Sequence, residues 1–128
     1  MTVVLDTSAY SDWRKDGRWN EIISTADRVL VPVVVLGELR AGFLRGQQGA
    51  ANERKLVRFL SFPVVQVVPV VEASSRWYAE FKHQLRLAGK PIPENDVWIA
   101  ALAVEHAAML LTSDAHFEHL PQVARAVE

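Results

Sequence analysis

The sequence predicts an α/β fold in which helices cover both faces of a mainly parallel sheet of four to five strands. Short runs rich in valine, isoleucine and leucine recur along the chain and are typical of buried strands. Segments with apolar residues at helical spacing alternate with these runs throughout. Half of the 128 residues are hydrophobic and 23% are charged, which is the composition of a globular domain.

The first half of the chain is expected to contain two strands and four helices. In chain order we expect a strand at 2–5, a short helix capped by Thr7 or Ser8 and running to about Arg14, a helix at 18–26, a strand at 28–31, a helix beginning at Pro32 and a helix at 50–62. The stretch from Gly46 to Gly49 is expected to be a loop between the last two helices.

The second half continues the alternation. We expect a strand at 64–68, a long helix at 72–88 ended by Gly89, a helix capped by Asn95 or Asp96 and running to about His106, a strand at 109–112, and an edge strand at 123–127. No glycine-rich phosphate loop follows any of the strands, which argues against a dinucleotide-binding domain.

Charge and cysteine content exclude several classes of protein. Basic residues number 14 and acidic residues 15, so any nucleic-acid surface must be local. The chain has no cysteine, which excludes disulfides and thiolate metal sites and fits a reducing cytoplasm. The apolar runs are too short to span a bilayer and are interrupted by proline, so we expect no membrane association. We expect one domain covering 1–128 in a cytoplasmic protein.

Four acidic residues lie beside the predicted elements, far apart in the chain. Asp6 and Asp114 each directly follow an apolar run that is typical of a buried strand. Glu38 lies in the early turns of the helix beginning at Pro32, and Asp96 lies at the start of a later helix. If the strands are parallel neighbours, their carboxyl ends share one edge of the sheet, where α/β folds place their sites.

Carboxylates crowded at this edge would repel one another, which raises their pKa values. A divalent cation removes the conflict, because Mg²⁺ and Mn²⁺ prefer oxygen ligands. No Cys–His or Ser–His pair suggests a covalent nucleophile. The sequence therefore favours an acidic metal site at which the metal activates water.

Each acid also has a structural explanation of its own. Asp6 could cap the helix after it, and Asp96 could cap its own helix. Glu38 could be a solvated helix residue paired with an arginine, and Asp114 could form a turn after its strand. All four explanations would have to hold together for the metal site to be wrong.

The segments that carry these acids resemble the motifs of the PIN-domain nucleases, in the arrangement of the VapC-type toxins of bacterial toxin–antitoxin systems. The matching stretches, in chain order, are VLDTSA, VLGELRAGF, PENDVWIAALA and LLTSDAHF. The resemblance covers essentially the whole chain. It implies a PIN-like three-layer α/β/α fold and a single PIN domain at 1–128.

The resemblance also implies a function. It is that of a toxin of a type II toxin–antitoxin system: an endoribonuclease that uses Mg²⁺ or Mn²⁺ to hydrolyse phosphodiester bonds in RNA. The implied catalytic residues are Asp6, Glu38, Asp96 and Asp114. Asp6, Asp96 and Asp114 would bind the metal directly or through water, whereas Glu38 would bind it or orient the attacking water. The implied partners are the RNA substrate, a VapB-type antitoxin that blocks the acidic pocket, and a second copy of the chain in a homodimer.

Other polar residues near the acids have less certain roles. Thr7, Thr112 and Ser113 could orient a carboxylate or a bound water, or could form turn and cap hydrogen bonds. His116 and His119 could ligate a metal, although a histidine-rich site would favour Zn²⁺ and is not part of the family pattern.

Three surface features could serve the partners. Five cations on two successive helices could track RNA phosphates or could be a solvated face; they are Arg40, Arg45, Arg54, Lys55 and Arg58. Trp13 and Trp19 are core residues by default, and the resemblance favours an antitoxin groove for part of their region. Trp77 begins an apolar face with Phe81 and Leu85 that is either core or a homodimer contact.

Two other classes of function remain as alternatives. The chain could be a PIN-like binding module that acts mainly in an antitoxin–DNA regulatory complex, with little nuclease activity. It could also be a phosphatase with Asp6 as nucleophile, but that chemistry needs a second acid two residues later, where this chain has Ser8.

Overall fold

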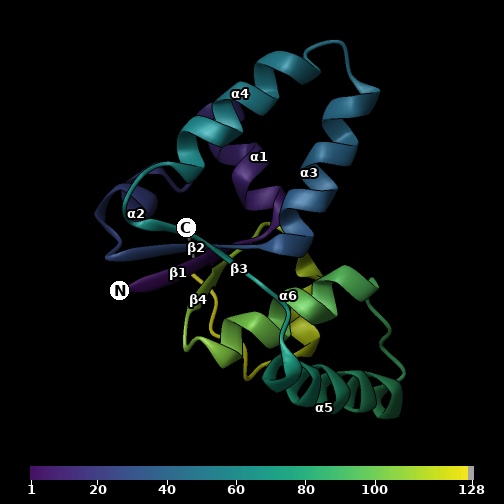
Figure 1. Cartoon of the computed structure of the whole chain (residues 1–128). Helices are drawn as coiled ribbons and strands as arrows, with labels where there is room; N and C mark the ends of the chain where they lie inside the picture. The colour runs from purple at the N-terminus through teal and green to yellow at the C-terminus, as the bar shows by residue number, and fades with distance from the viewer. Residues whose placement is uncertain (127–128) are drawn as a thin grey trace.

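The computed structural model describes residues 1–126 and contains a sheet between two groups of helices (Figure 1). The strands are β1 (Thr2–Leu5), β2 (Arg28–Pro32), β3 (Val65–Val68) and β4 (Met109–Leu111). The helices are α1 (Thr7–Asp16), α2 (Asn20–Thr25), α3 (Val33–Arg45), α4 (Gly49–Leu60), α5 (Glu72–Ala88) and α6 (Glu94–Glu105), and a 3₁₀ helix, η1, spans Ala115–His119.

The sheet is parallel throughout, with strand order β3-β2-β1-β4. Val3 of β1 faces Val29 of β2 on one side and Met109 of β4 on the other, so β1 and β4 end at the same edge. Figure 1 shows α3 and α4 above the sheet and α5 and α6 below it. This arrangement confirms the predicted three-layer α/β/α fold.

Apolar runs form the strands because both faces of the sheet are covered. Val3, Val4 and Leu5 of β1 are all 0% exposed. Helix α6 packs on α5 and is buried from Ile99 to Ala103. A helix that is apolar on nearly all sides belongs inside the protein, where it holds its first turn in a fixed place.

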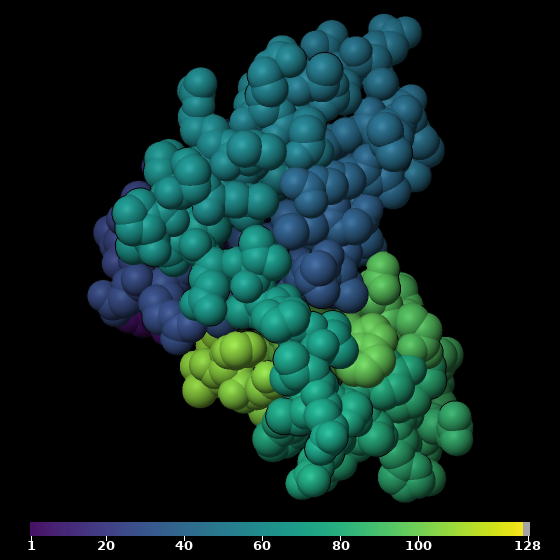
Figure 2. Space-filling model, in the orientation of Figure 1, coloured from purple at the N-terminus to yellow at the C-terminus, as the bar shows by residue number. Residues whose placement is uncertain are grey.

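Helices α3 and α4 pack on each other and form an arm. The space-filling view shows this arm standing apart from the lobe that contains α5 and α6, with a notch between them (Figure 2). Within residues 1–126, no helix is both long enough and apolar enough to cross a membrane.

Two predicted helix caps were wrong. Asp6, rather than Thr7 or Ser8, is the N-cap of α1, because its side chain accepts a hydrogen bond from the Ala9 amide. The N-cap of α6 is Pro93, two residues before Asn95, and the Pro93 carbonyl accepts the Asp96 amide at 3.0 Å. Asp96 therefore lies in the first turn of α6 instead of capping it.

The carboxyl-terminal segment differs from the expected edge strand. In the described residues it forms one parallel bridge to β4, between Arg125 and Leu110. The Leu110 amide donates to the Ala124 carbonyl, and the Ala126 amide donates back to Leu110. Val127, the last residue of the predicted strand, lies outside the described residues.

Candidate functional site

Asp6 ends the central strand and begins α1, and it is 1% exposed. Its Oδ1 accepts hydrogen bonds from the Ala9 amide at 2.8 Å and from the Ser8 hydroxyl at 2.7 Å. Its Oδ2 accepts one from the Thr112 hydroxyl. Asp6 is thus a helix cap, but the cap involves only one of its two oxygens. The other oxygen faces the loop after β4.

Thr112 connects Asp6 to Asp114. Its hydroxyl donates to Asp6 and accepts the backbone amide of Asp114 at 3.0 Å. The next amide, that of Ser113, donates to the Ser8 hydroxyl at 3.1 Å. These bonds fix the loop after β4 against the start of α1, so two acids 108 residues apart in sequence are held side by side across neighbouring strands.

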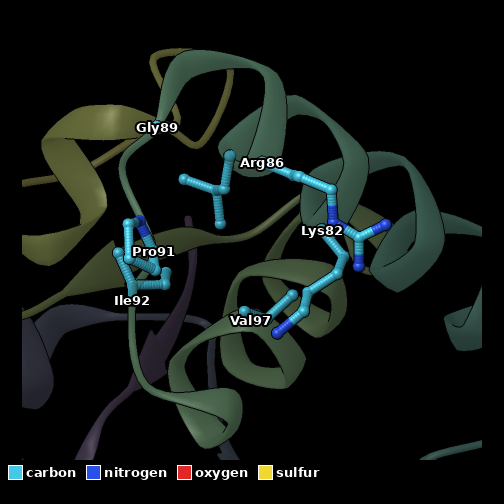
Figure 3. A pocket seen from close by; sticks show the side chains of 7 residues that line it. Lys82, Arg86, Gly89, Pro91, Ile92 and Val97 are labelled. Carbon is cyan, nitrogen blue, oxygen red and sulfur yellow. The ribbon is translucent and has the colours of Figure 1, made fainter.

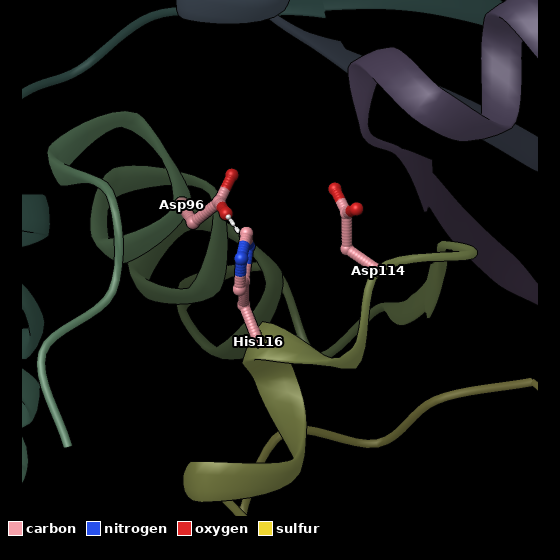
Figure 4. Close-up of side chains that lie close together, drawn as sticks. All are labelled: Asp96, Asp114 and His116. Atoms are coloured by element: carbon pink, nitrogen blue, oxygen red, sulfur yellow. Dashed lines mark hydrogen bonds and ion pairs between the residues drawn. The ribbon is translucent and has the colours of Figure 1, made fainter.

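Asp96 lies in the first turn of α6, where the helix dipole favours a negative charge. It is 8% exposed. Its Oδ2 lies 2.7 Å from Nδ1 of His116, which comes from η1 (Figure 4). Figure 4 also shows Asp114 facing this pair from the loop after β4. One ligand atom from each of the three side chains lies within 4.8 Å of the others.

Glu38 lies in the second turn of α3 and is half-buried. Its Oε1 accepts a hydrogen bond from the Thr7 hydroxyl at 2.7 Å. Because Thr7 is the residue after Asp6, this bond ties α3 to the end of β1. The hydroxyl of Thr7 therefore orients an acid, as the sequence analysis suggested.

The charges of the four acids interact. Asp114 raises the pKa of both Asp6 and Asp96, and Glu38 also raises that of Asp96. Asp96 and Asp114 thus have ligand atoms within 4.8 Å of each other, whereas Asp6 and Glu38 adjoin them through the hydrogen bonds of Thr112 and Thr7. The four acids meet at the carboxyl edge of the parallel sheet.

Burial is the main cause of the raised pKa values. Burial raises the pKa of Asp6 to about 6, even though the bonds from Thr112, Ser8 and Ala9 lower it. Burial also raises the pKa of Asp96, against the opposing effect of its contact with His116. These carboxyls are therefore unusually costly to ionise in the metal-free protein.

The residues present fit a hard divalent cation. The site gathers carboxylate oxygens, and no lysine or arginine within residues 1–126 is among the groups that shift the pKa of Asp6 or Asp96. Mg²⁺ and Mn²⁺ take such oxygen ligands, and a cation would offset the repulsion among them. In the part of the chain that the structure describes, the nitrogen that joins this cluster belongs to His116.

Sequence reasoning gave too little weight to two side chains. Ser8 was considered only as a helix cap, yet its hydroxyl bridges Asp6 and the Ser113 amide. Its position two residues after Asp6 was the available signal. His116 reaches Asp96, whereas His119 is exposed and is not part of the cluster.

Other residues lie away from the acids. Glu94, two residues before Asp96, is exposed and pairs with Lys82 and the Tyr78 hydroxyl. Arg40 is engaged by Glu53 through two guanidinium nitrogens, the closer at 3.0 Å. The remaining cations predicted for RNA are exposed on α3 and α4; they are Arg45, Arg54, Lys55 and Arg58.

The two amino-terminal tryptophans have different environments. Trp19 is 1% exposed, so it is a core residue and cannot line an antitoxin groove. Trp13 is half-buried and packs on Phe59 with ring centroids 5.0 Å apart. The Arg14 guanidinium lies 4.5 Å from the Trp13 ring centroid. Trp13 thus belongs to an aromatic cluster that joins α1 to α4.

Among the described residues, several cavities lie outside the acidic cluster, and two of them bear on the predicted surfaces. One, of about 340 Å³, lies between the end of α5 and the loop before α6 (Figure 3), and its lining includes Lys82, Arg86, Ile92 and Val97 but none of the four acids. The other, of about 300 Å³, lies among α1, α3 and α4; its lining residues are Tyr10, Ser11, Arg14, Lys15, Leu39, Phe43, Asn52 and Lys55.

A parallel sheet with carboxylates converging at its carboxyl edge defines an α/β protein with the acidic kind of site that metal-dependent enzymes use. The PIN domain family model matches residues 3–123, and the chain belongs to the PIN-domain family.

The chain is similar to ribonuclease VapC5 of Mycobacterium tuberculosis, at 32% identity over 94% of this chain and 89% of the relative. It is also similar to the crystal structure of VapBC-5 of the same organism, a member of the VapBC family of toxin–antitoxin systems, with a TM-score of 0.73 and 30% identity over 98% of this chain and 95% of that one. The fold is shared with VapBC2 of Rickettsia felis bound to a promoter DNA fragment, with a TM-score of 0.86 and 24% identity over 98% of both chains.

Proposed function

We propose that this chain is the toxin of a type II toxin–antitoxin system and an endoribonuclease that depends on Mg²⁺ or Mn²⁺. The observation that carries the proposal is the convergence of Asp6, Glu38, Asp96 and Asp114 at one edge of a PIN-family sheet. The similarity to a protein named ribonuclease VapC5 supports RNA as the substrate. Residues 1–128 would act as one PIN domain in the cytoplasm, where the RNA substrate is found.

Asp6, Asp96 and Asp114 would hold the cation. A bound divalent cation lowers the pKa of its water and offsets negative charge on a phosphodiester. Thr112 keeps Asp6 and the Asp114 backbone in register, and Thr7 orients Glu38 so that its free oxygen can accept a proton or position water. The exposed cations of α3 and α4 would bind RNA phosphates.

The proposed protein partners are a VapB-type antitoxin and a second copy of the chain. Similarity to the VapBC-5 complex supports the antitoxin. The lining of the cavity among α1, α3 and α4 offers it the apolar residues Leu39 and Phe43 and the cations Arg14, Lys15 and Lys55. A homodimer would use Trp77, which is 37% exposed and lies beside the buried Phe81.

The deciding experiment measures cleavage of single-stranded RNA by the purified chain. We expect Asp6→Asn and Asp96→Asn to lower the rate by at least about 100-fold, because each removes a carboxylate from the cluster. Glu94→Gln is the matched control. It changes an acid two residues from Asp96 that pairs outside the cluster, so it should leave the rate nearly unchanged. Thermal unfolding would verify that all variants fold.

Chelation tests the cation separately. EDTA should stop cleavage, and Mg²⁺ or Mn²⁺ should restore it. Full activity in EDTA would rule out the metal-dependent reaction. A wild-type chain that folds and binds its antitoxin but does not cut RNA with either metal would favour the alternative of a binding module in a regulatory complex.

A further inference from the structure

Within residues 1–126, His116 is the one nitrogen ligand of the cluster with Asp96 and Asp114, and its place there is built by the fold. It lies in η1, next to Phe117, which is 0% exposed and anchors this helix in the core. The anchor holds the imidazole beside Asp96, with Nδ1 at 2.7 Å from Oδ2 (Figure 4). The backbone at this partly exposed ring is therefore held in place by the core.

We propose that His116 is a direct ligand of the divalent cation, through Nδ1, and that this nitrogen makes the site prefer Mn²⁺ to Mg²⁺. The proposal rests on the proposed function, because it assumes that Asp96 and Asp114 hold a cation.

The distances suit a shared ion. Two atoms bound to one cation at about 2.1 Å lie at most about 4.2 Å apart. The chosen atoms of Asp96, Asp114 and His116 lie within 4.8 Å of one another in the absence of an ion. Side-chain rotations that close this set by roughly half an ångström would complete the contacts.

The two tautomers of the His116 ring allow it either to donate a hydrogen bond to Asp96 or to bind a cation. With hydrogen on Nδ1, the ring donates to Asp96 in the metal-free protein. With hydrogen on Nε2, the Nδ1 lone pair faces the acids and can bind an ion. The side chain is 45% exposed, so water can accept the Nε2 hydrogen.

The nitrogen changes which ion binds best. Both ions take oxygen ligands, but Mn²⁺ is a first-row transition metal and accepts an imidazole nitrogen more readily than Mg²⁺, which gains little from one. A site of carboxylates plus one imidazole should therefore favour Mn²⁺ more than a site of carboxylates alone.

Pulsed electron paramagnetic resonance of the full chain with Mn²⁺ alone tests the proposal without any assay of activity. We expect the nitrogen-14 coupling of a directly bound imidazole in the wild-type protein. It should disappear in His116→Ala and persist in His119→Ala, which removes the exposed histidine of the same 3₁₀ helix. His116→Ala should also weaken Mn²⁺ binding by about tenfold and Mg²⁺ binding by less than about twofold.

The outcomes separate the proposal from the proposed function. Bound Mn²⁺ without imidazole coupling in the wild-type protein would overturn the role of His116 and leave the acidic metal site intact. Equal losses of Mn²⁺ and Mg²⁺ affinity in His116→Ala would overturn the claimed preference. A wild-type chain that binds no Mn²⁺ and cuts RNA in EDTA would remove the metal site itself.

Discussion

At the residue scale, the environment of Asp6 opposes its ionisation. Three hydrogen-bond donors favour the carboxylate, but burial outweighs them and raises its pKa to about 6. The negative charge of such a carboxylate is destabilised by burial, and a bound cation would stabilise it. The same reasoning applies in direction to Asp96, whose pKa is also raised by burial.

The raised pKa of Asp6 predicts how the stability of the metal-free protein depends on pH. Between pH 3.8, the ordinary pKa of an aspartate, and about pH 6, the folded protein keeps this proton while the unfolded chain has lost it. The contribution of the protonated Asp6 to the free energy of unfolding is therefore complete below pH 3.8 and is lost as pH rises through about 6. A shift of roughly two units corresponds to roughly 3 kcal/mol.

Urea unfolding in EDTA at pH 4 and pH 7 measures this effect. Other carboxyls, such as Asp27 and Glu94, have lowered pKa values and act in the opposite direction. The comparison is therefore with Asp6→Asn, which should gain stability relative to the wild type on going from pH 4 to pH 7. Glu118→Gln, an exposed acid in η1, should follow the wild type. Parallel curves for Asp6→Asn and the wild type would refute the assignment.

At the element scale, the site depends on where β1 and β4 end and where α6 begins. Strands β1 and β4 end in register, so Asp6 and the loop that carries Asp114 lie side by side. Pro93 begins α6 early enough that Asp96 occupies its first turn. Small shifts in these boundaries would move a carboxylate by several ångströms, because each helical residue advances 1.5 Å and turns the side chain.

Helix α5 packs on α6, and Phe81 is one of the buried residues of α5. Phe81 is 2% exposed, so Phe81→Ala should lower the free energy of unfolding by about 3–5 kcal/mol. Trp77 on the same helix is 37% exposed, so Trp77→Ala should cost less than about 2 kcal/mol. Chemical denaturation measures both values.

Sedimentation of the same two variants tests the homodimer. If the Trp77 face joins two copies, Trp77→Ala should weaken association while the monomer stays folded. A wild-type chain that remains monomeric at high concentration, or a dimer unaffected by Trp77→Ala, would show that this face is not the contact.

At the scale of the whole molecule, the fold has a core that does not need a metal. Strands β1 and β4 and the middle of α6 bury apolar residues, whereas the acids lie at the edge of the sheet. A cation should therefore add stability to a protein that already folds.

Mn²⁺ at 100 times its dissociation constant should stabilise the protein by about 2.7 kcal/mol, or about 10 °C in Tm. The shift should shrink at pH 5, because Asp6 and Asp96 must lose protons to bind the ion and their pKa values are raised. Calorimetry at pH 7.5 and pH 5 measures it, and Asp96→Asn should show little shift at either pH. An equal shift at both pH values would contradict the link between these protons and the cation.

The sequence by itself determined the layered fold, the four strands and the four acids. Apolar runs between helical segments leave few other arrangements, and an acid directly after a buried strand stands out against its surroundings. The resemblance of four short motifs to one family added the expected function. The edge strand expected at 123–127 forms only one bridge among the described residues. Pairing at the edge depends on the path of this segment, and its sequence has no clear strand pattern.

Only the tertiary structure decided how the acids are held and what joins them. Thr112 binds Asp6 across 106 residues, Thr7 binds Glu38 across 31, and His116 reaches Asp96 across 20. Hydrogen bonds of this kind depend on strand register and on where each helix begins. These quantities arise from packing of the whole chain, so no local stretch of sequence encodes them.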